Sequence, residues 1–405
     1  MKKKAALLIV RKNYREIDWI LPLLYKINKE YKLITFFQNK ISLKKFSEEN
    51  ITLYKKWKKI NLFYFSPPIK YILLNKIFQF LTFKNKYLSQ LANEYFRKKI
   101  YSKNYLEQVL FKNNLGNYNV KLVFHEYSKN TSWINSFLGE KDIKIIKFPD
   151  ATVPKGNYKI DKSNSKKIKY INNLIILASS KNDLSLYKNL YNQKNIKIVG
   201  YPRYEDKWVK FFTKNKINKS KKIFLVGCKQ YKPNQKNNIK SQINSIMNAT
   251  SLIKNSLTIF KPHPAQDIDE LKSMLSNFEK NLWKVSNDHV LNYKNLAELF
   301  IGFHRSSTVL DALACNLPTV KLWSWKAMDK NDFGEQRYIK RYGIHNSILT
   351  ELKLTKLVLN ENELKRIILS NKQFKNKLLK KQKINFRKLT VYNSRMAKTL
   401  REIFK

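Results

Sequence analysis

A histidine held between two prolines is the first group in this chain that could bind an anion. His263 stands between Pro262 and Pro264 and follows Lys261, which ends an apolar stretch at residues 257–261. Each proline fixes its φ at about −65°, so the imidazole has little freedom beside the lysine. An imidazole and an ammonium side by side suit a phosphate oxygen. The alternative is a structural histidine in a turn that the prolines stiffen.

A pair of serines follows the apolar stretch at residues 299–302. Ser306 or Ser307 stands where a helix is expected to begin, in the position of an N-cap residue. Backbone N–H groups, hydroxyls and the positive end of the helix dipole would meet there, which favours the pyrophosphate of a nucleotide-activated donor. The alternative is an ordinary helix cap without a ligand.

Other residues near these strand ends could also contact a donor. His304 and Arg305 precede the serines and could hold a phosphate or a sugar carboxylate. Thr308 adds a hydroxyl, and Asp311 follows at a distance that would reach a ribose or sugar hydroxyl. Gly227 ends another apolar stretch and opens into a loop.

A sharp turn separates the two halves of the chain. Gly200 and Pro202 follow the apolar stretch at residues 196–199, and Arg203 comes directly after them. The turn would direct Arg203 across a cleft or make it the anchor of a hinge, although a structural turn with a surface arginine fits equally well.

Activation of an acceptor hydroxyl needs a base near the cleft. Asp150 follows an apolar strand and a proline, and Glu126 follows His125 at the end of another strand. Glu16 and Asp18 come after the first strand, where Asp18 is expected to cap a helix. Each of these carboxylates could instead be an ordinary surface group.

Short apolar runs alternate with longer amphipathic stretches, as in parallel α/β domains. Strands are predicted at residues 5–10, 32–37, 62–65, 120–125, 143–148, 174–178, 196–199, 223–227, 257–261, 299–302 and 319–323. Helices are predicted at residues 18–30, 69–112, 241–254, 267–277 and 307–314, with a Lys-rich helical ending over 360–405.

The fold class predicted from this alternation is α/β, with two doubly wound, Rossmann-like domains facing each other across a cleft. Residues 1–200 would form an N-terminal acceptor-binding domain and residues 201–385 a C-terminal nucleotide-donor-binding domain. Residues 386–405 would form a C-terminal helix that packs back on the first domain. Ligands bind at the carboxyl ends of the strands in such sheets, where the candidate residues stand.

The composition is strongly cationic. The 405 residues include 81 Lys and Arg against 29 Asp and Glu, a formal net charge of +52, and only 11 of the 81 are Arg. Nucleic-acid binding is one interpretation, but base recognition relies on bidentate Arg, which is scarce here. Enrichment in Lys alongside Asn, Ile, Tyr and Phe is typical of an AT-rich genome. We therefore favour this genomic origin of the charge, together with attraction to an anionic membrane surface, over nucleic-acid binding.

Cysteine usage and the N-terminus bear on location. Cys228 and Cys315 are too few for a disulfide framework and lack metal-ligand spacing, which fits a reducing cytoplasm. The apolar run at residues 5–10 is too short for a signal peptide and is predicted to be a buried strand. No stretch approaches the ~18 apolar residues of a membrane-spanning helix, so membrane contact would be peripheral.

Three motifs together resemble a known group, the CDP-glycerol glycerophosphotransferase (teichoic-acid polymerase-like) family and the related GT-B surface-polysaccharide transferases. The family's Gly-x-Pro-Arg turn is similar to residues 200–203, and its His-Pro motif to residues 263–264. Its Ser-Ser helix start with a following acidic residue is similar to Ser306, Ser307 and Asp311. The resemblance covers residues 196–325.

The resemblance implies that His263, Ser306 and Ser307 contact the donor phosphates. The glycerophosphotransferases carry Asp-Tyr before the serines, whereas this chain has Phe303, His304 and Arg305 there. Cys228 follows the strand at residues 223–227, where that family often shows a Pro-Thr-Trp pattern. We therefore expect a sugar donor, with a CDP-linked polyol-phosphate donor as the alternative.

The expected function is a nucleotide-sugar-dependent glycosyltransferase that builds a capsular or lipopolysaccharide-type bacterial surface polysaccharide. It would act at the inner face of the plasma membrane on a glycan or lipid-linked acceptor, with no cofactor beyond the nucleotide-sugar co-substrate. The rivals are a hydrolysing nucleotide-sugar epimerase and a basic nucleic-acid-binding protein. GxGxxG, GxxxxGK[ST] and GxSxG are absent. The single Asp-x-Asp, at residues 267–269, is interpreted as a helix cap, so transfer is expected to be metal-independent.

Overall fold

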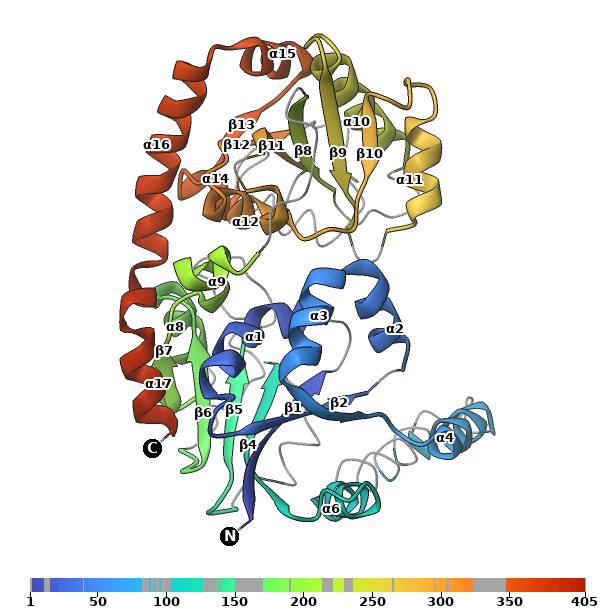
Figure 1. Ribbon diagram of the computed structural model, residues 1–405, viewed down its shortest axis with the longest axis vertical. Coiled ribbons are helices and arrows are strands. Elements are labelled where there is room, and N and C mark those ends of the chain that lie inside the picture. The colour runs from blue at the N-terminus through green and yellow to red at the C-terminus, as the bar shows by residue number, and fades with distance from the viewer. Residues whose placement is uncertain are drawn as a thin grey trace.

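A computed structural model describes most of the chain. The described residues are 2–10, 15–38, 40–81, 87–88, 91, 95, 103–126, 137, 140–149, 170–188, 191–212, 221–228, 236–263, 266–294, 296–303, 306–322 and 347–404. Figure 1 shows two α/β units, one above the other, with two successive C-terminal helices running along one side, the first beside the upper unit and the second beside the lower one.

The N-terminal unit is built on a seven-stranded parallel sheet with the strand order β3-β2-β1-β4-β5-β6-β7. The chain builds outward from β1 in one direction through β2 and β3 and then crosses back to β4 beside β1. The strands are β1 (Lys3–Val10), β2 (Lys32–Phe37), β3 (Asn61–Phe65), β4 (Tyr118–Glu126), β5 (Lys144–Phe148), β6 (Leu174–Ala178) and β7 (Ile196–Ile198).

Both faces of this sheet are covered, because the inner strands are apolar on both sides. In β1, Ala6, Leu8 and Val10 pack into one buried cluster, while the alternate residues Leu7 and Ile9 pack into another on the opposite face. The covering helices are α1 (Arg15–Ile27), α2 (Lys40–Glu49), α3 (Ile51–Ile60), α6 (Lys103–Lys112) and α8 (Lys181–Lys188), whereas α4 (Ile69–Leu81) projects from the unit (Figure 1).

The C-terminal unit repeats this plan with six parallel strands in the order β10-β9-β8-β11-β12-β13. The strands are β8 (Lys222–Gly227), β9 (Ser256–Lys261), β10 (Trp283–Val285), β11 (Ala297–Phe303), β12 (Thr319–Leu322) and β13 (Lys356–Val358). The helices are α10 (Lys236–Thr250), α11 (Ile268–Leu275), α12 (Thr308–Ala314), α14 (Ile348–Glu351) and α15 (Glu361–Leu369).

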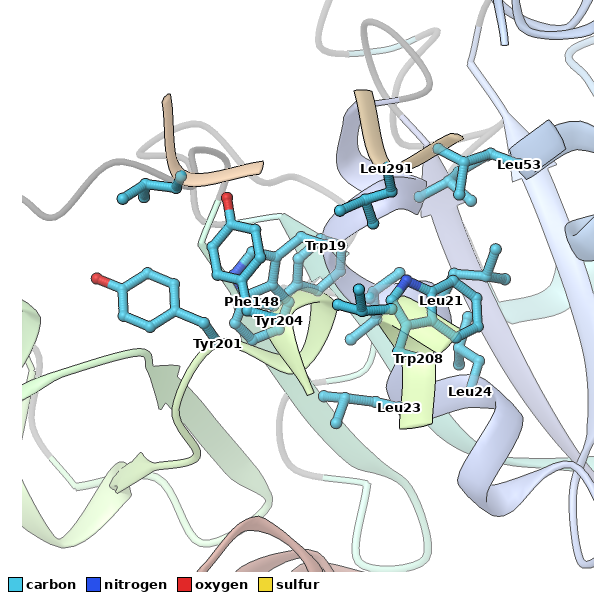
Figure 2. Packing of buried hydrophobic residues seen from close by; sticks show 14 of the residues in the cluster. Trp19, Leu21, Leu23, Leu24, Leu53, Phe148, Tyr201, Tyr204, Trp208 and Leu291 are labelled. Carbon is cyan, nitrogen blue, oxygen red and sulfur yellow. The ribbon is translucent and has the colours of Figure 1, made fainter. Parts of the chain in front are cut away.

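The described part of the junction between the units, residues 199–212, contributes several buried side chains. After a 3-10 turn, η1 (Gln193–Asn195), and strand β7, the chain forms a second 3-10 turn, η2 (Pro202–Tyr204), and the short helix α9 (Asp206–Lys210). Tyr204 and Trp208 of this junction belong to a buried cluster that also contains Trp19 of α1 and Leu291 of the 3-10 turn η4 (Val290–Tyr293). Figure 2 shows these side chains packed together, so one apolar core continues from one unit into the other.

The C-terminal segment fastens both units. Gln382 of α16 (Lys372–Leu389) pairs with the backbone of Thr319, accepting from its N–H at 3.0 Å and donating to its carbonyl at 2.7 Å. After the 3-10 turn η6 (Val391–Arg395), helix α17 (Met396–Phe404) lies on the N-terminal unit, where Lys144 Nζ donates to the carbonyl of Ile403 at 2.9 Å. The chain therefore ends on the unit in which it began (Figure 1).

The predicted pair of doubly wound domains is confirmed, and all eleven predicted strands occur within a few residues of their expected bounds. The two strands that were not predicted, β10 and β13, have three residues each, too few for an apolar run to stand out. Within the region predicted as helical over 69–112, the structure describes α4 and α6.

Candidate functional site

The carboxyl ends of three neighbouring strands bring the sequence motifs to one edge of the C-terminal sheet. β8 pairs in parallel with β9 on one side and with β11 on the other, so Gly227, Lys261 and Phe303 end their strands side by side. Adjacent strands lie about 4.8 Å apart, so the motifs after β9 and β11 flank Gly227 across roughly 10 Å. The sheet reverses its winding direction between β8 and β11, and such a reversal is where doubly wound domains bind ligands.

Lys261 ends β9 with its ammonium turned inward from solvent. Its Nζ donates to the carbonyl of Asn287 at 2.7 Å. Burial lowers the pKa of Lys261 to about 8, although Asp288, Glu49 and Asp18 favour the charged form. A lysine with this pKa carries its charge at neutral pH and loses it in mild alkali, so an anion beside it would hold the proton more firmly.

His263 lies in a tight turn beside that lysine. Its backbone N–H donates to Gln266 Oε1 at 3.2 Å, and the N–H of Gln266 donates back to the His263 carbonyl at 2.8 Å. His263 and Lys261 line a small hollow together with Glu49, the last residue of α2. The His-Pro motif of the C-terminal unit therefore faces the N-terminal unit, as a residue of an interdomain site must.

The hydroxyls after β11 are packed directly against the end of β8. Ser306 Oγ and Thr308 Oγ1 are hydrogen-bonded to each other. A Cβ at Gly227 would lie 2.5 Å from Thr308 Oγ1 and 3.0 Å from Ser306 Oγ, so only glycine allows this approach. Ser307 is the residue before α12, but its side chain makes no capping hydrogen bond.

Arg203 connects the two units through a buried cluster of charges. Its Nη2 lies 2.8 Å from Asp18 Oδ2 in α1 and donates to Asp311 Oδ1 in α12 at 2.6 Å. His289, which precedes η4, places its Nε2 3.3 Å from the same Asp18 oxygen. We call these four residues the interdomain cluster; each of them is less than 9% exposed.

The interdomain cluster contains two carboxylates for one guanidinium, and their pKa values move in opposite directions. Burial opposes ionisation of Asp18, but Arg203 and His289 outweigh it and hold the pKa of Asp18 below its usual value. Burial raises the pKa of Asp311 above its usual value, because Arg203 offsets the loss of solvent only in part. The pKa of Arg203 is raised further above its normal range by Asp18 and Asp311, against the effect of burial.

The hydrogen bonds of His289 fix its tautomer. Its Nδ1 accepts the backbone N–H of Leu291 at 3.1 Å, so the ring proton sits on Nε2 and is donated to Asp18. The ring also packs against Phe212, with centroids 4.7 Å apart. No local sequence motif marks His289, and its partner Asp18 lies 271 residues away along the chain, so only the folded structure reveals this residue.

Arg203 and Asp311 are engaged with each other in this arrangement. Their expected contacts with a donor stay predictions, but their observed contacts make Arg203 the anchor between the units. Asp18, expected to cap α1, lies inside that helix and serves as a partner of Arg203 instead. Its position one turn into α1 directs the carboxylate toward the C-terminal unit.

The expected acceptor-activating residues are placed in part. Glu126 ends β4 and is buried together with His125, whose Nδ1 contacts the Glu126 carbonyl oxygen. β4 lies beside β1, and this pair is the point where the N-terminal sheet reverses its winding direction. Asp150, His304 and Arg305 lie outside the described residues, so their positions stay predictions.

The Asp-x-Asp segment forms a helix cap. Asp267 Oδ1 accepts the backbone N–H groups of Asp269 at 2.9 Å and Glu270 at 3.2 Å, at the start of α11. Within the described ranges, no three His, Cys, Asp or Glu side chains gather as they would around a metal ion.

A larger cavity lies at the other end of the N-terminal unit. It has a volume of about 760 Å³ and is lined by residues near the amino ends of β1 and β4, including Lys2 and Tyr118, and by residues of α6. It contains none of the strand-end motifs. The edge formed by β8, β9 and β11 therefore stands as the candidate site on its chemistry and on its position in the topology.

Comparison with known proteins establishes the fold. No family model matches the chain, and no curated protein matches its sequence. Among solved structures, it is similar to a Listeria monocytogenes protein described as a putative UDP-N-acetylglucosamine 2-epimerase, with 10% identity, a TM-score of 0.57, and coverage of 100% of this chain and 97% of that one.

Two further solved structures have the same architecture. A UDP-GlcNAc 2-epimerase from Neisseria meningitidis bound to UDP-GlcNAc has 10% identity and a TM-score of 0.55, over 98% of this chain and 100% of that one. The S. aureus protein MnaA, solved with UDP, has 12% identity and a TM-score of 0.52, over 98% and 97%. At these identities the likeness concerns the fold alone, which is the GT-B arrangement of two Rossmann-like domains.

Proposed function

We propose that this GT-B protein is a nucleotide-sugar-dependent glycosyltransferase, with residues 1–200 binding the acceptor and residues 201–385 binding the donor. One observation carries the proposal: Gly227, the Lys261–His263 turn and the Ser306–Thr308 hydroxyls come together at the edge of the donor-side sheet where its winding reverses. Backbone N–H groups, hydroxyls and cations at such an edge suit the diphosphate of an activated sugar.

In the proposed complex the diphosphate lies across the end of β8. The glycine lets the hydroxyls of Ser306 and Thr308 lie against the end of β8, so the anion would meet those hydroxyls on the β11 side and Lys261 and His263 on the β9 side. His304 and Arg305 are proposed to add donors from the loop before Ser306. Arg203 and Asp311 would act from behind this edge, holding the two domains at the separation that the ligand requires.

The proposed reaction is a displacement at the anomeric carbon. The acceptor oxygen forms a bond to that carbon as the bond to the diphosphate oxygen breaks, and a carboxylate removes the hydroxyl proton. Glu126 and Asp150 are the proposed bases. The leaving diphosphate gains negative charge, which Lys261 and His263 would neutralise without a metal ion.

The acceptor is proposed to be a bacterial surface glycan or its lipid-linked precursor, handled in the cytoplasm at the inner face of the plasma membrane. The three motifs that resemble surface-polysaccharide transferases support this choice. None of the helices among the described residues has the length and apolar character needed to cross a bilayer.

The central test is the variant His263→Ala in purified protein. Transfer from the preferred donor should fall at least ~100-fold, the scale expected for loss of one positioned acid–base or electrostatic group. The matched control is Asp269→Ala, an exposed carboxylate on α11, which should leave turnover unchanged. Near-normal turnover of the His263 variant would refute the proposed site.

A panel of nucleotide donors separates the proposed function from its rivals. Stabilisation by UDP-, GDP- or CMP-linked sugars supports a sugar transferase, whereas stabilisation by CDP-glycerol alone indicates a polyol-phosphate transferase. The solved epimerases with the same fold make one outcome important. Conversion of a UDP-sugar to a changed sugar and free nucleotide without any acceptor would identify an epimerase.

A further inference from the structure

A stripe of exposed apolar side chains runs along α4, a helix that projects from the side of the N-terminal unit (Figure 1). Among the α4 side chains that the structure describes, the six exposed apolar ones fall within an arc of roughly 160° at about 100° per residue, and Lys76 is exposed at the edge of that arc. The exposed fractions are 53% for Leu73, 45% for Leu74, 52% for Ile77, 47% for Phe78, 78% for Phe80 and 72% for Leu81.

The same end of the unit carries further exposed apolar groups. Phe111 of α6 is 78% exposed, and α6 lies with α4 at the end of the N-terminal unit that points away from the C-terminal unit (Figure 1). Exposed apolar side chains also follow α4 along the chain, at Tyr87, Leu88, Leu91 and Tyr95. A contiguous exposed apolar surface of this kind marks a site that binds either another protein or a membrane.

The charge of the chain favours a membrane over a second copy of the protein. Residues 69–112 contain nine basic residues against two acidic ones, within a protein of net charge +52. A second copy would bring the same positive charge against the stripe, whereas an anionic lipid surface attracts it. The basic residues are Lys70, Lys76, Lys84, Lys86, Arg97, Lys98, Lys99, Lys103 and Lys112, and the acidic ones are Glu94 and Glu107.

We propose that α4 is a lipid-contact helix that lies in the interface of an anionic bilayer. Its 13 residues span about 20 Å, which is less than the ~30 Å hydrocarbon core, so the helix cannot cross a membrane. The exposed apolar side chains beside the exposed Lys76 would let the helix lie flat, with those side chains among the acyl chains and the lysine at the headgroups.

Vesicle binding tests this inference. The full-length protein should bind vesicles of phosphatidylcholine with about 30% phosphatidylglycerol and bind phosphatidylcholine alone much more weakly. The triple variant Leu74→Gln, Ile77→Gln, Leu81→Gln should bind the anionic vesicles at least ~10-fold more weakly. The control variant Leu252→Gln, Leu369→Gln changes two apolar residues of similar exposure in the C-terminal unit and should bind as the parent does.

A fluorescent label on α4 tests insertion without removing the stripe. In Phe80→Cys the new thiol is exposed, whereas Cys228 and Cys315 are buried and their pKa values are raised by burial, so an environment-sensitive dye attaches selectively. Its emission should rise and shift to the blue on addition of anionic vesicles.

Any one of three results would overturn the inference. The first is equal vesicle binding by the triple variant and the parent, and the second is an unchanged dye signal on bound vesicles; each would mean that lysines elsewhere hold the protein to the lipid. The third is a change in the oligomeric state of the triple variant without a change in its vesicle binding, which would make a second copy of the chain the occupant of the stripe. No substrate enters these measurements, so their result is independent of the proposed transferase activity.

Discussion

At the scale of single residues, the two cations Lys261 and Arg203 differ in how they respond to pH. Lys261 is largely withdrawn from water and its pKa is about 8, whereas Arg203 keeps its charge at every accessible pH. The two cations also differ in their partners: the Lys261 ammonium donates to the backbone carbonyl of Asn287, whereas Arg203 forms ion pairs with the carboxylates of Asp18 and Asp311.

Binding of a nucleoside diphosphate should weaken as the pH rises above about 8, because the Lys261 ammonium loses its proton there. A bound anion favours the charged form, so the midpoint in the complex should lie above that of the free protein. The loss should approach ~10-fold per pH unit. Titration calorimetry between pH 7 and pH 10 measures it, and Lys261→Arg should remove this dependence. An unchanged pH profile in that variant would count against a role for Lys261.

Removal of Arg203 should destabilise the protein strongly. Arg203→Ala leaves Asp18 and Asp311 buried without their cation, which costs about 3–5 kcal/mol in comparable sites. The control is Lys26→Ala, which breaks the more exposed pair with Glu205 and should cost about 1 kcal/mol or less. Urea unfolding compares the two, and similar losses would show that the interdomain cluster contributes little.

At the scale of elements, the junction and the C-terminal segment hold each other in place. Asn393 of η6 pairs with the backbone of Tyr201, its Oδ1 accepting the N–H at 2.7 Å and its Nδ2 donating to the carbonyl at 3.0 Å. Gly200 makes this approach possible, because its φ is +80° and a Cβ would lie 2.3 Å from Asn393 Oδ1. This contact and the pairing of Gln382 with Thr319 attach the last helices to both units.

Asn393→Ala should therefore loosen the C-terminal helix. Loss of two hydrogen bonds to buried backbone should cost about 1–3 kcal/mol, and limited proteolysis should cleave near residues 390–404 sooner than in the parent. The control is Asn385→Ala, whose amide makes only a 3.3 Å contact within its own helix at the surface. Equal protease resistance of the two variants would show that the hydrogen bonds between Asn393 and Tyr201 do not hold the C-terminal helix in place.

At the scale of the whole molecule, repulsion among the many positive side chains destabilises the folded state. A net charge of +52 over 405 residues repels itself, and the short-range ion pairs of the described residues involve only a fraction of the cations. What opposes this repulsion is the apolar core that continues through the junction, with Trp19, Trp208 and Leu291 at its centre (Figure 2).

Added salt should raise the thermal stability of this protein. Between ~10 mM and ~150 mM ionic strength the screening length falls from about 30 Å to 8 Å, which weakens repulsion between distant lysines. The melting temperature should increase by at least ~2 °C, measured by calorimetry in NaCl and in KCl. A fall in both salts would mean that surface ion pairs, and not repulsion, dominate.

The sequence by itself determined the two sheets and the strand ends that carry the chemistry. Strands buried on both faces are continuous apolar runs, so β1, β8, β9 and β11 are visible without any partner. Because parallel strands end at one edge, the motifs at His263 and Ser306 could be assigned to the same side of a sheet.

Only the tertiary structure decided which charges meet across the domains. Asp18, Arg203, His289 and Asp311 come from four separate elements, and each looks like an ordinary cap, turn or helix residue in its own segment. Their pairing depends on how two independently wound sheets dock, and that docking is set by the shape of the shared apolar core. No local pattern of residues encodes that shape, because the contacting side chains lie up to 271 residues apart.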